Sequence, residues 1–584
     1  MHSFTMFRII FLLFLHFLHT TSTSHSVILK NGTIMGMTLK SSSGRNFSAF
    51  RGIPYALPPI GPWRFEPPQP SPAWTDIRYT KFDGKKCIHQ NVYFRKDYVI
   101  GHEDCLYLNV YTPKMNYETV GANHKYPVMV WFHGGSWSTG SGHSLHYGPE
   151  FLLNHDLVLL TINFRIGPFG FLSTGDTVIP GNMGLKDQVH ALKWVQENIE
   201  VFGGDPKNVT IFGNGVGAAS VHYLMLSPLA KGLFHRAISQ SGTVKNPWSF
   251  NTQKMASKVT RKFARDLKCP VGDSETMLKC LRKIDAKKMA SVEVEWPLFD
   301  LDPIMPFRPV VEPPHAGAFL TQDPLEMENL KNGSDVPWMV GTNSHEGIFR
   351  VGSIYGQTKS GLIEELNTKF LEYAPITLAF QNNCPKPVHG KVTKLIRSFY
   401  VGGKNKKIDE TTKLAVTNMY SDALFNVANN KAIEKHFQMA SAPIYHYHLT
   451  HRSEISYMKF YGDYRTPYGV AHHDEIQYLF PVHDTLFPVA SFTDDDRKMM
   501  EIITTMWFNF AKTGNPMEPE KPSMVDVNWE PVSSEHLEYL LIGGPKNLSM
   551  SKDLFKDRIT FWEKLPCRAG VAPSQVFISV QDEL

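Results

Sequence analysis

The sequence predicts an α/β fold, with a large, mostly parallel central sheet and helices on both of its faces. Two apolar runs rich in Val, Ile and Leu, at residues 127–132 and 157–162, are typical of central strands that helices cover on both sides. A helical pattern follows at 184–195, and the turn residues at 203–206 end it. Strands and helices that alternate in this order form a doubly wound sheet.

A second helix is predicted near the C-terminus, at residues 494–513. Thr493 is a suitable N-cap, and the acidic residues 494–496 favour the positive end of a helix dipole. Gly514 ends the pattern. We interpret its apolar stripe as core packing rather than a cofactor site. The segments 245–340 and 350–465 give mixed helix and loop signals.

Composition excludes some classes of function. The chain has 584 residues, of which 42% are hydrophobic and 20% charged, and a formal net charge of +5. This is ordinary globular composition without a basic block, so we expect no nucleic-acid partner. No apolar stretch beyond the N-terminus is long enough to span a membrane. We expect residues 25–580 to form a single domain.

Both ends of the chain have sequences typical of targeting signals. Residues 1–24 have the pattern of a signal peptide, with Arg8, a short apolar run at 9–15 and small polar residues at 20–24. The last four residues, 581–584, read Gln-Asp-Glu-Leu, which differs by one residue from an endoplasmic-reticulum retention signal. We therefore expect the secretory pathway, and favour retention in the endoplasmic reticulum lumen over release.

Glycosylation acceptors and cysteines agree with that compartment. Six cysteines in an oxidising environment favour disulfides. One short loop lies between Cys87 and Cys105 and another between Cys269 and Cys280. Cys384 and Cys567 could pair, stay free or link two chains. Sequence motifs for N-glycosylation occur at Asn31, Asn46, Asn208, Asn332 and Asn547.

The residues 212–220 match the strand-to-helix turn that holds the nucleophile of serine hydrolases, written G-x-S-x-G. Gly213 and Gly217 occupy the two small positions of this turn, but its central position is Gly215. A phosphate-binding turn is the alternative. It is disfavoured because the chain lacks both a dinucleotide G-x-G-x-x-G and a P-loop lysine here.

A glycine-rich loop follows the predicted strand at 127–132 and suits an oxyanion hole. Backbone N–H groups in such a loop stabilise the negative oxygen of a tetrahedral intermediate. We assign this role to Gly134, Gly135 and Ser136, together with Val216 after the elbow. A plain glycine turn is the alternative interpretation of the loop.

With these motifs, nearly the whole mature chain resembles the type-B carboxylesterase and cholinesterase family, a branch of the α/β-hydrolases, and most closely the insect carboxylesterases. The resemblance implies the α/β-hydrolase fold, the disulfides Cys87–Cys105 and Cys269–Cys280, and an ion pair between Glu103 and Arg165. The motifs that support it are 50–56, 103–111, 163–165, 181–188, 202–206 and 239–242.

The resemblance also assigns the catalytic positions. The segment 341–347 points to Glu346 as the triad acid, and 469–475 points to His472 as the base. The serine position falls on Gly215. His473 is interpreted as a packed or solvated neighbour. Ser220 is a poor substitute nucleophile, because five residues along a helix turn it away from the oxyanion hole.

The expected ligand is a small lipophilic ester or a similar molecule in an apolar gorge, with no cofactor and no metal. Cation recognition is disfavoured, because Asn214 replaces the acidic residue of cholinesterases and the 87–105 loop has no tryptophan. The leading hypothesis is a carboxylesterase-like protein without ordinary serine-esterase turnover. The alternatives are an ester hydrolase with residual activity, in which His472 activates water, and a protein-interaction member of the family.

Overall fold

The computed structural model describes residues 25–571, except 91–98, 115–124, 293–295, 304, 325, 327–329, 357–359, 403–405, 489 and 519–524. The proposed signal peptide and the tail at 581–584 lie outside the described residues. Among the helices that are described, none is long and apolar enough to cross a membrane.

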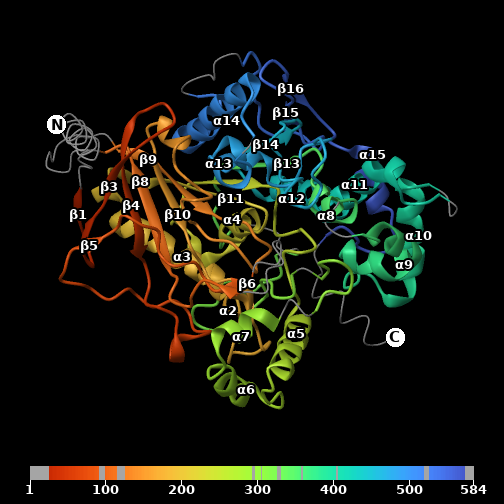
Figure 1. Ribbon diagram of the computed structural model, residues 1–584, viewed down its shortest axis with the longest axis horizontal. Helices are drawn as coiled ribbons and strands as arrows, with labels where there is room; N and C mark the ends of the chain where they lie inside the picture. Colours follow the sequence, from red (N-terminus) through yellow and green to blue (C-terminus); the bar gives the residue numbers. More distant parts are fainter. Residues whose placement is uncertain are drawn as a thin grey trace, which may run out of the picture.

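The centre of the molecule is an 11-stranded sheet with the order β16-β15-β14-β13-β12-β11-β9-β10-β8-β4-β3 (Figure 1). Neighbouring strands from β10 to β15 are parallel, and antiparallel strands complete both edges. The predicted sheet is therefore confirmed. Its strands are β3 (Met37–Lys40), β4 (Asn46–Pro54), β8 (Tyr107–Thr112), β9 (Tyr126–Phe132), β10 (Val158–Ile162), β11 (Gly204–Asn214), β12 (Arg236–Gln240), β13 (Trp338–Asn343), β14 (Ile444–Leu449), β15 (Tyr539–Ile542) and β16 (Leu548–Ser551).

Helices cover both faces of this sheet. Side chains alternate between the two faces along a strand, so consecutive residues of β12 point in opposite directions. Ser239 Oγ donates a hydrogen bond to the backbone oxygen of Ala218 in α4 (Val216–Leu226), whereas Gln240 accepts one from Trp507 in α14 (Asp494–Thr513). Helices α4 and α14 therefore lie on opposite faces.

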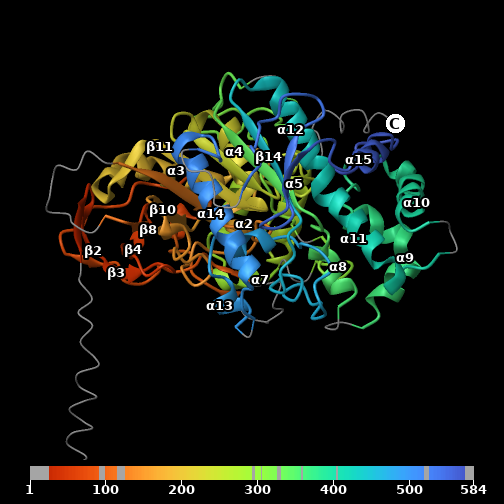
Figure 2. The same ribbon diagram turned by 90° about the horizontal axis from the view of Figure 1, so that it is seen from above.

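The remaining helices add to this core. Helix α3 (Met183–Asn198) packs against α4 and β11. Figure 1 shows an outer group around α5 (Gln253–Asp266), α6 (Ser274–Leu281) and α7 (Ala286–Ser291). A second outer group, seen in Figures 1 and 2, lies around α9 (Leu362–Thr377), α10 (His389–Tyr400) and α15 (Lys556–Glu563). Between the second group and the sheet lie α8 (Ile348–Ile354), α11 (Lys413–Ser421) and α12 (Val427–Met439).

Both helices predicted from the sequence are present. Helix α14 has the expected cap: the Thr493 hydroxyl accepts from the backbone N–H of Asp496, whose carboxylate accepts in return from the N–H of Thr493. Gly514 ends it with a φ of +89°. Met499, Ile502 and Met506 are buried, which agrees with core packing.

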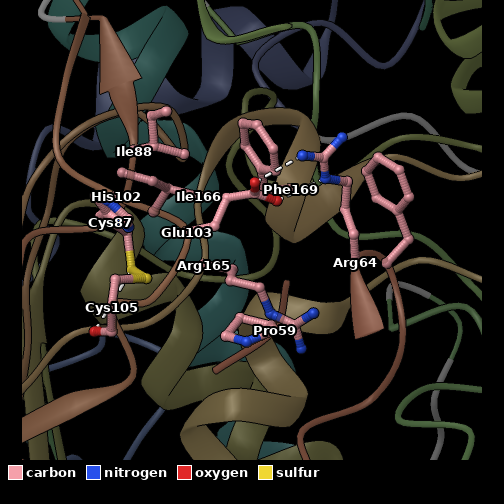
Figure 3. A pocket seen from close by; sticks show the side chains of 11 residues that line it. Pro59, Arg64, Cys87, Ile88, His102, Glu103, Cys105, Arg165, Ile166 and Phe169 are labelled. Carbon is pink, nitrogen blue, oxygen red and sulfur yellow. Dashed lines mark hydrogen bonds and ion pairs between the residues drawn. A yellow bond between two sulfur atoms is a disulfide. The ribbon is translucent and has the colours of Figure 1, made fainter. Parts of the chain in front are cut away.

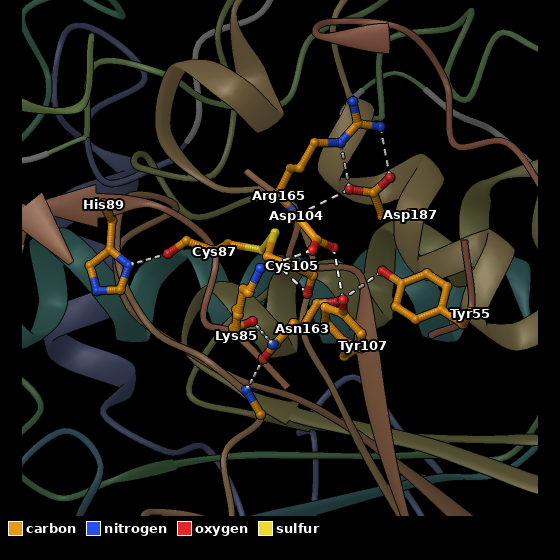
Figure 4. Close-up of a disulfide and its surroundings, with 11 residues drawn as sticks. Tyr55, Lys85, Cys87, His89, Asp104, Cys105, Tyr107, Asn163, Arg165 and Asp187 are labelled. Carbon is orange, nitrogen blue, oxygen red and sulfur yellow. Dashed lines mark hydrogen bonds and ion pairs between the residues drawn. A yellow bond between two sulfur atoms is a disulfide. The ribbon is translucent and has the colours of Figure 1, made fainter. Parts of the chain in front are cut away.

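One expected ion pair is wrong, because Glu103 and Arg165 have other partners. Glu103 binds Arg64, whose Nε and Nη2 each donate across 2.6 Å (Figure 3). Arg165 forms a two-point pair with Asp187 of α3, at 2.8 and 2.7 Å (Figure 4). The buried Asp187 matches the planar guanidinium with both oxygens, and this geometry favours it as the partner.

All six cysteines form disulfides. The two expected pairs, Cys87–Cys105 (Figure 4) and Cys269–Cys280, are present. The open question about the other two is answered by a third bond, Cys384–Cys567, which joins positions 183 residues apart. The five predicted glycosylation asparagines all reach solvent: Asn31 and Asn208 are partly exposed, and Asn46, Asn332 and Asn547 are exposed.

Candidate active site

Gly215 lies in a sharp turn between β11 and α4. Its backbone has φ +57° and ψ −116°, a conformation that is strained for any residue with a side chain. Its N–H donates to the backbone oxygen of Gln240 at 2.9 Å, and its own carbonyl accepts from the N–H of Ala219 at 2.9 Å. The chain therefore forms an elbow at the predicted position.

The two flanking glycines allow the strand and the helix to approach closely. A Cβ atom on Gly213 would lie 2.6 Å from the backbone carbon of Gly217, and one on Gly217 would lie 2.0 Å from the backbone oxygen of Phe132. Both distances are far below van der Waals contact. Any larger residue would push α4 away from β9 and β11.

We expect the substitution Gly217→Ala to destabilise the protein by about 2–4 kcal/mol, because the added methyl group would overlap backbone atoms that cannot move independently. Thermal unfolding and soluble yield measure the effect. Gly390→Ala is the matched control, since that glycine lies in helix α10 with nothing within 4 Å of the added Cβ. The control should be neutral or slightly stabilising. Equal melting temperatures for the two variants would contradict the packing argument.

Glu346 and His472 come together beside the elbow. Glu346 follows β13 and is 0% exposed, and His472 precedes a 3₁₀ helix (Asp474–Tyr478). His472 Nδ1 lies 2.7 Å from Glu346 Oε2, and Glu346 Oε1 accepts from the backbone N–H of Asn343 at 2.7 Å. The carboxylate is thus held at both oxygens and orients the imidazole ring.

The geometry leaves Nε2 of His472 facing Gly215. When Nδ1 donates to the Glu346 carboxylate, Nε2 carries the lone pair. A Cβ atom built on Gly215 would lie 2.9 Å from this nitrogen. Burial lowers the pKa of His472, so its imidazole is neutral at physiological pH and able to accept a proton. The structure therefore brings together the three positions that the sequence motifs selected.

The glycine-rich loop lies next to the elbow, because a Cβ atom on Gly134 would lie 3.0 Å from the backbone oxygen of Asn214. Gly135 and Ser136 have positive φ values of +122° and +57°, and the carbonyl of Gly135 accepts from the N–H groups of Ser138 and Thr139. These bonds hold the loop in a tight turn after β9. Val216 is the first residue of α4, so its N–H has no acceptor within the helix. The assignment of these N–H groups to an oxyanion hole stays a prediction from the sequence.

Glu475, which the sequence motifs did not single out, joins the ends of β11, β12 and β13 next to the elbow. Its Oε1 accepts from the side-chain amides of Asn214 and Gln240, and its Oε2 accepts from Asn343 Nδ2 at 2.6 Å. Glu475 is 2% exposed, and burial raises the pKa of its carboxyl to about 7. A second acidic residue in the segment 469–475 was the available signal. Asn214 is turned towards Glu475 and is anchored there.

Aromatic side chains surround the two histidines. The rings of Phe425 and Phe349 lie 4.7 and 5.8 Å from that of His472, and Tyr457 lies 5.3 Å from His473. Trp248 packs on Phe425 at 5.8 Å. Among the described residues, no group of three or more His, Cys, Asp or Glu side chains is arranged to hold a metal ion.

The sheet order, the elbow and the adjacent His472–Glu346 pair define an α/β-hydrolase. The sequence model of the Carboxylesterase family matches residues 23–562, so the chain belongs to this family. A carboxylic ester hydrolase from Bombus ignitus is 36% identical over 540 residues, which cover 91% of this chain and 93% of the relative. A juvenile hormone esterase from Tribolium castaneum is 35% identical over 570 residues, or 93% and 94% of the two chains.

A solved structure gives the same result. The crystal structure of juvenile hormone esterase from Manduca sexta, with OTFP covalently attached, superposes with a TM-score of 0.79 and 28% sequence identity. The match covers 93% of this chain and 99% of that one. The relationship therefore extends over almost the entire fold.

Proposed function

We propose that this protein is a carboxylesterase-family member that binds small lipophilic esters or similar molecules without forming an acyl-enzyme. The observation that supports this function best is Gly215 itself. The elbow points its central residue at His472 Nε2, and that residue has no side chain to attack a carbonyl. The acid, the base and the oxyanion loop around it are arranged for an ester.

The ligand class follows from the walls of the site. Phe349 and Phe425 present ring surfaces beside His472, and such surfaces favour apolar groups. Asn214, the residue before the nucleophile position, turns its amide to Glu475 and adds no negative charge to the pocket. An uncharged, lipophilic ester therefore fits better than a quaternary ammonium compound.

Labelling with a fluorophosphonate probe tests the absence of a nucleophile. We expect intact-mass analysis of the wild-type protein to show no adduct, and its reaction with 4-nitrophenyl acetate to show no burst of 4-nitrophenol. Gly215→Ser is the positive control and should gain one adduct, located on the elbow peptide. An adduct or burst in the folded wild-type protein would show that another nucleophile acts, and would disprove the proposal.

Ligand binding is measured separately, by the thermal shift that a series of aryl esters and their non-hydrolysable ketone analogues produces. A ligand that binds only the folded state raises the melting temperature with its concentration. We expect the shift to grow with the apolar area of the ligand.

The three disulfides fit the secretory pathway, and we propose the endoplasmic reticulum lumen as the final compartment on the basis of residues 581–584.

A further inference from the structure

His473 lines the same site as His472. The two rings are 4.1 Å apart between centroids. His473 is partly exposed although the residues on both sides of it in the chain are buried. Its Nε2 lies 3.9 Å from the position of a Cβ on Gly215 and 3.1 Å from that of a Cβ on Gly134. The second histidine therefore faces the point between the elbow and the oxyanion loop.

The hydroxyl of Tyr461 bears on which nitrogen of the His473 ring carries the proton. The Tyr461 hydroxyl donates to the backbone oxygen of His472 at 3.2 Å and lies 2.5 Å from His473 Nδ1. Both contacts can be hydrogen bonds only when the hydroxyl donates to the carbonyl, which can only accept, and Nδ1 of His473 donates to the tyrosine oxygen. This leaves the lone pair on Nε2. Burial lowers the pKa of His473, which keeps the ring neutral.

Both histidines thus present an acceptor nitrogen to one place. Asn214 Oδ1 is a third acceptor nearby, 3.5 Å from the Gly134 Cβ position, and it has no hydrogen-bond partner among the described residues. Water has two O–H bonds, so one water molecule can donate to both imidazole nitrogens and keep a lone pair free for attack. A bound water that donates to two imidazoles becomes a better nucleophile.

We propose that His473 is a second catalytic residue, which together with His472 holds and activates a water molecule that attacks the bound ester directly. This inference rests on the proposed function, because it concerns the same site and the same ligands. It goes further by assigning a reaction that needs no side chain at position 215.

The proposed hydrolysis consumes only the ester and one water molecule. The water oxygen bonds to the ester carbonyl carbon while one water proton passes to His472 Nε2, and His473 Nε2 accepts the hydrogen bond of the other. The carbonyl electrons move to oxygen, which the N–H groups of the oxyanion loop stabilise. When the C–O bond to the alcohol breaks, the alkoxide takes the proton from His472. The products are the acid and the alcohol.

The backbone conformation at His473 allows the ring to be removed by a substitution with glycine. Its φ is +76°, a conformation that favours glycine over histidine. His473→Gly should therefore fold at least as well as the wild type, as thermal unfolding will show. His473→Gln is the conservative partner, because its side-chain oxygen can reach the place of Nε2.

The experiment measures kcat and KM for 4-nitrophenyl acetate, corrected for the reaction in buffer. We expect a slow wild-type turnover without a burst, a kcat lower by about 10-fold or more in His473→Gly with a smaller change in KM, and partial recovery in His473→Gln. The loss caused by His473→Gly should be several-fold smaller in the Gly215→Ser background, because the serine oxygen is then the nucleophile.

The outcomes separate this inference from the function on which it rests. Equal losses in both backgrounds would show that His473 acts only on structure, and would overturn the inference. So would a wild-type rate equal to that in buffer while Gly215→Ser is active, although binding without an acyl-enzyme would then still stand. A burst in the wild type would instead remove the proposed function itself.

Discussion

Gly215→Ser is expected to raise kcat for short-chain aryl esters by about 100-fold or more and to produce an acyl-enzyme burst. The serine oxygen would lie next to His472 Nε2, whose Nδ1 is already held by Glu346 at 2.7 Å. Stopped-flow measurement of 4-nitrophenol release, with fluorophosphonate labelling of the same sample, checks both parts of the prediction.

This gain comes with a cost in stability of about 1–3 kcal/mol, because a side chain is placed at φ +57°. The new Cβ would also lie 2.9 Å from His472 Nε2, so the imidazole has to retreat by a few tenths of an ångström. Gly215→Ala is the matched control, since it adds the same Cβ without the hydroxyl. Both variants should melt lower than the wild type, and only serine should add activity. A folded serine variant without activity would contradict the assignment of Glu346 and His472.

Acidification is expected to unfold the protein between about pH 6 and pH 4. Burial lowers the pKa of several histidines, to about 4 for His436 and His446 and about 3 for His133 and His448. A histidine with a lowered pKa favours the folded state above its unfolded pKa of about 6.5, and this contribution is lost as the pH falls towards the folded value. Each such group costs up to about 1.4 kcal/mol per pH unit.

Buried carboxyls act in the opposite direction but are fewer. Burial raises the pKa of Asp474 to about 8 and that of Glu475 to about 7, so their contribution is present at low pH and is lost as the pH rises through those values. Tryptophan fluorescence and circular dichroism against pH give the midpoint. A protein that remains folded at pH 4 would contradict the expectation that the buried histidines affect stability more than the buried carboxyls do.

His436→Leu isolates one of these histidines. Neither ring nitrogen of His436 has a hydrogen-bond partner among the described residues, so leucine removes the titration without breaking a bond. The stability lost between pH 7 and pH 5 should become smaller by about 2 kcal/mol. His102→Gln is the control, because His102 is exposed, so this exchange removes a histidine from the surface and not from the core.

The parts of this site that are local in sequence could be predicted from it. The spacing of Gly213, Gly215 and Gly217 is enough to predict the elbow, because the close approach of strand and helix leaves room only for glycine at its two ends. The family resemblance selected His472 and Glu346, and the structure places them together.

The parts that depend on partner choice could not be predicted. The resemblance implied Arg165 as the partner of Glu103, whereas in the fold Glu103 binds Arg64. The role of His473 depends on a positive φ and on Tyr461, a residue 12 positions away, and neither has a sequence signature. The Cys384–Cys567 bond joins distant segments and was open for the same reason.

The hydrogen bonds of Glu475 have a consequence for how replaceable the centre of the site is. They join Asn214 before the elbow, Gln240 at the end of β12 and Asn343 at the end of β13 into one unit, and none of them involves residue 215. The hydrogen bonds that hold the elbow are thus separate from the residue at the nucleophile position. Cysteine or aspartate at position 215 would therefore test other chemistries, as serine does, without breaking the hydrogen bonds of Glu475.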